Sequence, residues 1–98
     1  MFEPPAKDGY TIYSKTGCVN CVKALRMAED KLLGNWSQGL DLPLKYILCD
    51  DYLIEDRQGF LSTIKLFAGG DVKMFPMIFF DGEYIGSYNA LATHLESN

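Results

Sequence analysis

The stretch "YTIYSKTGCVNC", residues 10–21, places two cysteines directly after a run that is typical of a β-strand. Residues 10–14 are mostly aromatic or β-branched, which favours an extended strand. A short turn, residues 15–17, follows, and Cys18 and Cys21 then stand three positions apart. A Cys-x-x-Cys pair of this kind binds a metal, forms a structural disulfide or alternates between dithiol and disulfide.

Composition narrows these alternatives. The chain has 98 residues, 48% of them hydrophobic and 22% charged, which is typical of a single globular domain. Its net charge of −4 argues against nucleic acid or anionic membranes as partners, because both need a basic face. No apolar run approaches the roughly 20 residues of a membrane span. The opening "MFEPPAKDGY" shows neither the basic nor the apolar region of a secretory signal, so we expect a reducing, cytoplasmic location.

The cysteine count favours redox chemistry. Zinc normally takes four ligands, and beyond the pair the chain offers only Cys49 and His94, so we expect no metal. We interpret Cys49 as a core residue and His94 as a surface or hydrogen-bonding residue. A structural disulfide is disfavoured by the expected compartment. The remaining alternative is that the two cysteines are simply buried apolar side chains.

Hydrophobic periodicity predicts the other elements. Residues 19–34 read as an amphipathic helix whose apolar face carries Val22, Leu25, Ala28 and Leu32. The further expected elements are a strand at 44–49, a helix ending at Gly69–Gly70 and interrupted near Gly59, strands at 76–80 and 83–86 around an Asp-Gly turn, and a helix at 87–96.

The resulting order β-α-β-α-β-β-α predicts an α/β fold with a mixed four-stranded sheet flanked by helices. The alternation in the first half favours a parallel strand pair, and the Asp-Gly turn favours an antiparallel pair in the second half. Residues 10–98 are expected to form one domain, with residues 1–9 as an arm outside the core. Asp50 and Asp51 are interpreted as a solvated turn.

The position of the pair suggests its chemistry. Cys18 stands where the helix begins, so unpaired backbone N–H groups and the helix dipole favour its thiolate, and Lys15 adds a nearby positive charge. Cys21 falls on the same side of the first helical turn, within reach of Cys18. We therefore expect Cys18 to attack a disulfide, and Cys21 or an external thiol to resolve the mixed disulfide that forms.

Three separated segments resemble the glutaredoxin branch of the thioredoxin superfamily. They are "IYSKTGCVNC" (residues 12–21), "FPMIFFDGEYIG" (residues 75–86) and "GSYNAL" (residues 86–91), and the resemblance covers about residues 10–95. It implies a thioredoxin-like fold and a monomeric, glutathione-dependent oxidoreductase that reduces protein disulfides or glutathione mixed disulfides. Ribonucleotide reductase is an implied acceptor. A dimer that holds a [2Fe–2S] cluster and a redoxin reduced by thioredoxin reductase remain as alternatives.

The resemblance also implies residue roles. Cys18 is the nucleophile and Cys21 the resolving cysteine, while Pro76 is a cis-proline that faces them. The residues implied to bind glutathione or an extended substrate chain are Lys15, Asn20, Phe75, Pro76, Gly86, Ser87, Tyr88 and Asn89. The chain departs from the family where Val19-Asn20 replaces Pro-Tyr, where Met74-Phe75 replaces Thr-Val, and where Ala90 replaces an acidic residue.

Overall fold

The computed structural model describes residues 2–36, 44–72 and 74–97, and it confirms the predicted order of elements. The elements are β1 (Tyr10–Ser14), α1 (Val19–Trp36), β2 (Leu44–Leu48), α2 (Asp50–Ala68), β3 (Met77–Phe80), β4 (Glu83–Gly86) and α3 (Tyr88–Ser97). The largest difference from the sequence prediction is at α2, which begins at Asp50 where a solvated turn was expected. Within the described ranges, no helix is long and apolar enough to cross a membrane.

The four strands form one mixed sheet in the order β2-β1-β3-β4. β1 and β2 are parallel and β3 and β4 are antiparallel, as the sequence predicted. β1 also pairs antiparallel with β3, which the sequence analysis did not predict. The β3–β4 connection is the predicted Asp-Gly turn, in which Asp81 and Gly82 both have positive φ, 52° and 87°. Two consecutive residues with positive φ give a hairpin turn whose twist matches that of the strands it joins.

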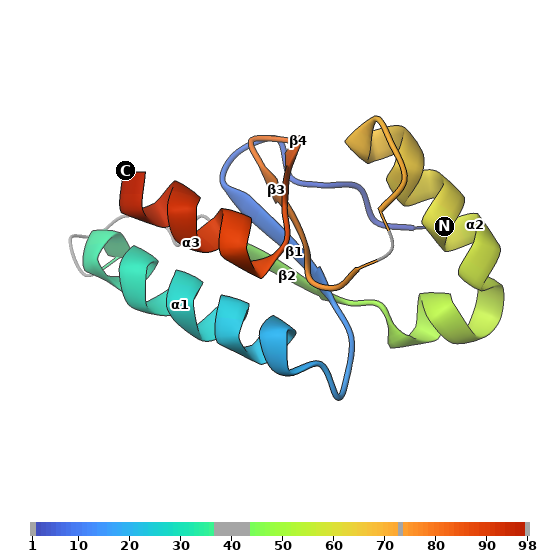
Figure 1. Cartoon of the computed structure of the whole chain (residues 1–98), viewed down its shortest axis with the longest axis horizontal. Coiled ribbons are helices and arrows are strands. Elements are labelled where there is room, and N and C mark those ends of the chain that lie inside the picture. Colours follow the sequence, from blue (N-terminus) through green and yellow to red (C-terminus); the bar gives the residue numbers. More distant parts are fainter. Residues whose placement is uncertain (1, 37–43, 73, 98) are drawn as a thin grey trace.

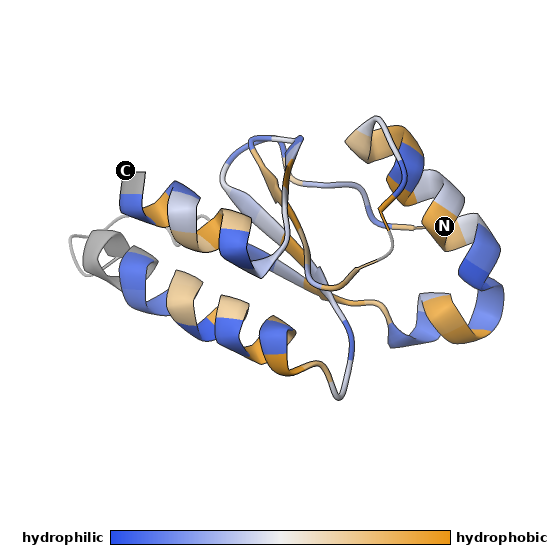
Figure 2. Cartoon of the chain, in the orientation of Figure 1, coloured by the Kyte–Doolittle hydropathy of each residue, from blue (hydrophilic) through white to orange (hydrophobic). Residues whose placement is uncertain are grey.

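Helices cover both faces of the sheet (Figure 1). α1 and α3 lie side by side on one face and α2 lies on the other. Strand side chains alternate between the two faces, so the core has two parts. Toward α1 and α3 it contains Tyr10, Ile12, Ala24, Ala28, Ile78, Leu91 and Leu95, and toward α2 it contains Tyr13, Ile47, Phe60, Ile64, Phe75, Met77 and Phe79. Figure 2 shows the long hydrophobic stretch along β3 and the mixed hydropathy of the helices.

The predicted apolar face of α1 is partly wrong. Cys21, Ala24 and Ala28 are buried, whereas Val22 is exposed and Leu25 is half-buried. The buried stripe follows the small residues because these let the helix backbone approach the sheet and α3 closely. The side chains of Leu32 and Trp36 lie outside those that the structure describes.

The N-terminal arm contacts the core, contrary to the sequence prediction. The ring of Phe2 packs edge-on against Tyr52 at 5.0 Å and Phe60 at 5.5 Å between centroids. The Tyr13 hydroxyl donates a hydrogen bond of 2.7 Å to the Glu3 carbonyl, and the Glu3 carboxylate pairs with Lys45 at 2.7 Å. The aromatic side chain of Phe2 thus extends the apolar cluster under α2, and the arm end lies beside that helix (Figure 1).

α2 is two helical segments joined at a kink. Asp56 has non-helical angles, φ −157° and ψ 75°, and its carboxylate accepts a hydrogen bond of 3.0 Å from the Gly59 N–H. Asp56 therefore caps the second segment as an N-cap aspartate does. The interruption expected near Gly59 lies three residues earlier.

Candidate active site

Cys18 is the N-cap residue of α1. Its carbonyl accepts the first helical hydrogen bond, 3.3 Å from the Val22 N–H, and its Sγ accepts a bond of 3.2 Å from the Cys21 N–H. In most helices a Ser or Asp oxygen makes this second contact. The Cys-x-x-Cys spacing is therefore the spacing from an N-cap side chain to the backbone N–H that it caps. Cys18 is half-buried, so part of this residue is open to solvent.

Cys21 differs from Cys18 in burial and in protonation. It is fully buried against the α2 side of the core. Burial, and after it the hydrogen bond between its side chain and that of Cys18, raises the pKa of Cys21 to about 12, although the backbone and charge of Lys15 act in the other direction. Cys21 is therefore a protonated thiol at neutral pH. The pair therefore consists of the half-buried Cys18, whose sulfur accepts a backbone hydrogen bond, and the buried Cys21, whose sulfur carries a proton.

The turn before Cys18 is bound to the start of α2. The Thr16 N–H donates a hydrogen bond of 2.9 Å to Asp50 Oδ1, and the Thr16 hydroxyl donates a second, short one to Oδ2. These bonds, the hydroxyl first, hold the pKa of Asp50 below its ordinary value. The prediction of a solvated turn is thus wrong for Asp50, while Asp51 is exposed. Sequence reasoning missed the contact because it joins residues 34 positions apart.

The segment before β3 lies at the same end of the sheet. Met77 pairs with Tyr13 near the end of β1, which leads into the cysteine turn. The Phe75–Pro76 peptide bond is cis, as the family resemblance implied. The Phe75 side chain is buried, and the Lys15 ammonium lies over its ring, 5.4 Å from the centroid. This cation–π contact holds the lysine beside the cis-proline segment.

The start of α3 completes this end of the molecule. Gly86 pairs with Ile78, and the Ser87 carbonyl accepts the first helical bond from the Leu91 N–H at 3.1 Å. Gly86 has a φ of 134°, and a Cβ there would lie 2.6 Å from the Ala90 Cβ. Glycine is therefore required where the chain turns sharply into the helix. Figure 1 shows α1 and α3 beginning at the same end.

The predicted site residues therefore gather at one end of the sheet, opposite the Asp81–Gly82 turn. They come from the turn and start of α1 (Lys15, Cys18, Asn20 and Cys21), from the cis-proline segment (Phe75 and Pro76) and from the start of α3 (Gly86, Ser87, Tyr88 and Asn89). Asn20 and Asn89 are exposed, and Ser87 and Tyr88 are half-buried. Their roles toward glutathione stay predictions.

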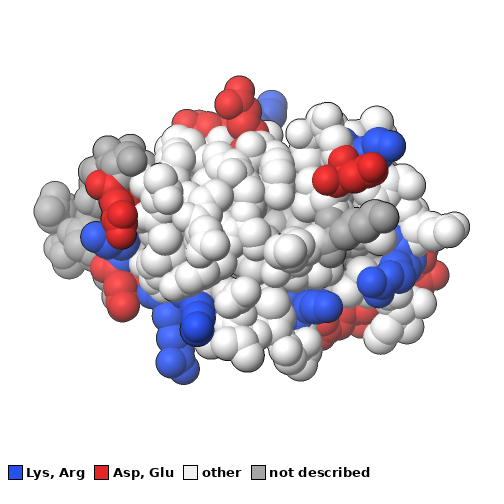
Figure 3. Space-filling model, viewed as in Figure 1, with Lys and Arg blue, Asp and Glu red and all other residues white. Residues whose placement is uncertain are grey.

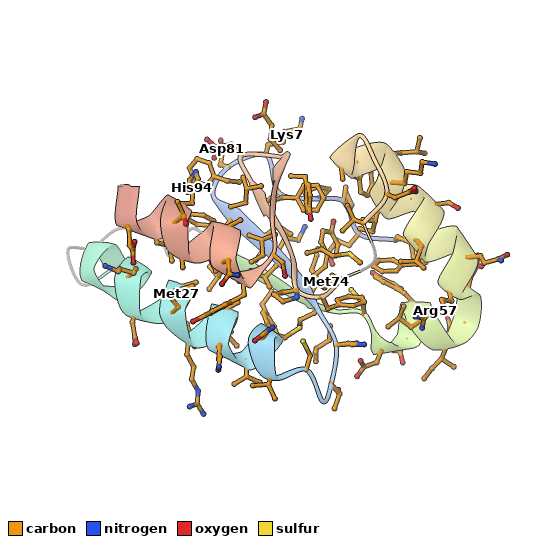
Figure 4. The ribbon with its side chains drawn as sticks, in the orientation of Figure 1. Lys7, Met27, Arg57, Met74, Asp81 and His94 are labelled. Carbon is orange, nitrogen blue, oxygen red and sulfur yellow. The ribbon has the colours of Figure 1, made fainter. Side chains whose placement is uncertain are left out.

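Two apolar side chains beside the site were not predicted. Val19 follows Cys18 and is 68% exposed, and Met74 precedes the cis-proline segment and is 70% exposed. Figure 4 shows Met74 near the middle of this face, and Figure 3 shows that uncharged atoms cover the same area while charges lie toward the rim. The departures from the family pattern at these two positions were the available signal.

Cys49 and His94 have the structural roles that the sequence suggested. Cys49 is fully buried, its S–H donates to the Ile47 carbonyl at 3.7 Å, and burial raises its pKa to about 12. His94 Nδ1 lies 2.6 Å from the Tyr10 hydroxyl, and its ring packs on Phe80. Among the residues that the structure describes, no group of three or more His, Cys, Asp or Glu side chains is placed to hold a metal.

Comparison with known proteins gives matches among solved structures alone, since no protein-family model and no curated protein matches the sequence. Reduced glutaredoxin from Escherichia coli matches with a TM-score of 0.67 and 27% identity, over 92% of this chain and 95% of that one. Glutaredoxin 1 from Francisella tularensis, complexed with cacodylate, matches with a TM-score of 0.64 and 21% identity, over 91% and 93%. A buckwheat glutaredoxin–glutathione complex matches with a TM-score of 0.61 and 20% identity, over 92% and 71%. The predicted thioredoxin-like fold is thereby confirmed.

Proposed function

Because this chain belongs to the glutaredoxin branch of the thioredoxin superfamily, we propose that it is a glutathione-dependent thiol–disulfide oxidoreductase. It acts as a cytoplasmic monomer on protein disulfides and glutathione mixed disulfides, with ribonucleotide reductase among its acceptors. The observation that carries the proposal is the asymmetry of the cysteine pair. The sulfur of the half-buried Cys18 caps a helix, and the buried, protonated Cys21 lies one turn further on.

The first half of the reaction uses the sulfur of Cys18. As a thiolate it attacks one sulfur of the substrate disulfide, forms a mixed disulfide and releases the other substrate sulfur as a thiolate that takes up a proton. The Cys21 N–H and the dipole of α1 stabilise negative charge at this position. Before the attack Cys21 keeps its proton, because its pKa is raised to about 12.

The second half resolves the mixed disulfide. With a protein disulfide, Cys21 loses its proton and attacks Cys18, which expels the reduced substrate and leaves a Cys18–Cys21 disulfide. Two glutathione molecules then supply the two electrons and leave as glutathione disulfide. With a glutathione mixed disulfide, a second glutathione attacks the adduct on Cys18 directly. Cys21 is dispensable in that route.

Glutathione binding is proposed at the start of α3 and at Lys15. The backbone N–H groups that begin a helix suit a carboxylate, here the γ-glutamyl carboxylate beside Gly86, Ser87, Tyr88 and Asn89. The Lys15 ammonium faces the glycine carboxylate, and the backbone of Phe75, before Pro76, pairs with the extended tripeptide or substrate chain. Asn20 is exposed beside the pair. A buckwheat neighbour of the same fold, solved in complex with glutathione, supports the proposal.

Steady-state disulfide reduction tests this function. We expect turnover of a glutathione mixed disulfide with NADPH, glutathione reductase and glutathione, and little turnover with thioredoxin reductase as the electron source. Cys18→Ser should abolish it, whereas Cys21→Ser should keep mixed-disulfide reduction and lose protein-disulfide reduction. Full activity of Cys18→Ser, or turnover with thioredoxin reductase alone, would overturn the proposal. Iron and acid-labile sulfide in anaerobically purified protein would support the cluster-binding alternative instead.

A further inference from the structure

We propose that Asp50 is the positioning residue for the nucleophile, acting through Thr16 on the turn that presents Cys18. This inference rests on the proposed function, and it adds a residue that lies outside the cysteine pair and outside the proposed glutathione contacts. Both oxygens of the Asp50 carboxylate are used, one by the Thr16 N–H and one by the Thr16 hydroxyl. A carboxylate that binds two donors of one residue fixes that residue's orientation as well as its distance.

The turn needs such a contact because it has little packing of its own. Lys15, Thr16 and Gly17 are all exposed, and Gly17 has a φ of 79°, a conformation open to few other residues. An exposed turn with few buried contacts opens easily. Cys18 follows the turn directly, so a change in the turn moves the sulfur relative to the helix N–H groups that hold its charge.

The backbone just before Asp50 is fixed by two hydrogen bonds, one to β1 and one within α2. The N–H of its neighbour Cys49 donates a hydrogen bond of 2.8 Å to the Ser14 carbonyl, which continues the parallel β1–β2 pairing beyond its last residue pair. The Cys49 carbonyl accepts the first helical bond of α2, from the Leu53 N–H at 2.9 Å. The carboxylate thus projects from a backbone fixed between the sheet and α2 onto the neighbouring, weakly packed turn.

Geometry and charge predict opposite effects here, which makes the inference testable. A carboxylate near a thiolate repels that negative charge, so loss of the charge alone should make Cys18 more reactive. Loss of the positioning contact should instead lower Cys18 reactivity at every pH. Asp51 is the matched control, because it is exposed and adjoins Asp50 in the same first turn of α2.

The experiment compares Asp50→Ala, Asp50→Asn, Thr16→Val and Thr16→Ser with the Asp51→Ala control. The readouts are the rate of Cys18 alkylation by iodoacetamide between pH 4 and 9, the reduction of a glutathione mixed disulfide, and the urea midpoint as a check of folding. We expect Asp50→Ala to lower both rates about tenfold, since small misplacements of reacting groups cost up to about a hundredfold. Asp50→Asn and Thr16→Val should lose about threefold each, while Thr16→Ser and Asp51→Ala stay within about twofold of the parent.

Equal effects of Asp50→Ala and Asp51→Ala, or faster labelling of Asp50→Ala in acid, would overturn the inference. If Asp50→Ala does not fold, the same decision rests on the comparison of two variants of the exposed Thr16. Thr16→Val removes the hydroxyl that donates to Asp50, whereas Thr16→Ser keeps a hydroxyl there. The double variant Asp50→Ala/Thr16→Val should be no slower than Asp50→Ala, because both remove one contact. If the parent does not reduce the mixed disulfide but the alkylation rates of the variants still follow this order, the proposed function is wrong and the positioning role of Asp50 stands.

Discussion

Replacing Cys18 by serine should leave a protein whose two remaining thiols, Cys21 and Cys49, are alkylated slowly. Burial raises the pKa of Cys49 to about 12, from an ordinary value of 9.0. Burial is also the largest cause that raises the pKa of Cys21, and this cause remains when the contribution of the Cys18 side chain is removed. The thiolate fraction of Cys49 at neutral pH is then about a thousandfold smaller. A thiolate of higher pKa is intrinsically more nucleophilic, with a Brønsted coefficient of about 0.4–0.5, which restores about 15- to 30-fold. The net expectation for Cys49 is alkylation about 30- to 60-fold slower than that of free cysteine, before any steric protection, and the buried Cys21 should also label more slowly than free cysteine.

Iodoacetamide labelling of the native Cys18→Ser variant, followed by digestion and mass spectrometry, measures this directly. Trypsin separates the two thiols, because cleavage at lysine and arginine yields residues 16–23 with Cys21 and residues 46–57 with Cys49. The labelling rate should rise about tenfold per pH unit with no plateau below pH 10. Cys21→Ser is the matched control and should label rapidly at Cys18. A plateau below pH 9 in Cys18→Ser, or labelling as fast as free cysteine, would refute the assigned asymmetry of the pair.

Three further predictions concern the scaffold of the site. Phe60→Leu should lower the free energy of unfolding by about 1–2 kcal/mol, because Phe60 is fully buried and its ring stacks on Phe75. Urea denaturation measures this change. The control Phe67→Leu should lower the free energy of unfolding by less, because Phe67 is only half-buried. Gly86→Ala should cost about 1–3 kcal/mol in the same measurement, since its φ is strained for alanine and its Cβ would contact Ala90, and an unchanged midpoint would contradict the geometry. The Thr16 hydrogen bonds lower the pKa of Asp50 from 3.8, so its stabilising contribution is present above that ordinary value and is lost as the pH falls through the lower folded-state value. The stability difference between the parent and Asp50→Asn should therefore shrink between pH 5 and pH 2, and a difference that is constant across this range would show that the carboxylate is not bonded in this way.

The elements of the fold were predictable because each has a strong local signal. The Asp81–Gly82 turn, the aromatic and β-branched run of β1 and the glycines after α2 mark their own boundaries. The buried face of α1 was not predictable, because its register depends on how closely the helix approaches the sheet. Ala24 and Cys21 form that face where larger apolar residues were expected.

The reacting residues of the candidate site were predictable, whereas the contacts that support them were not. The sequence spacing of Cys18 and Cys21 determines how they lie, because Cys21 is the third helical residue after an N-cap at Cys18. The contact of Asp50 with Thr16 and that of Phe2 with Phe60 join distant parts of the chain. They depend on strand pairing and on the path of the arm, which local patterns do not encode.

Trapping of the covalent intermediate tests the assigned roles of the two cysteines most directly. The Cys21→Ser variant, incubated with glutathione disulfide, should gain the mass of one glutathionyl group, located on Cys18 by fragmentation. The parent should pass on to the intramolecular disulfide without accumulating that adduct, and Cys18→Ser should gain none. An adduct on Cys49, or a stable adduct on Cys21 in the Cys18→Ser variant, would contradict the assignment of Cys18 as the attacking sulfur.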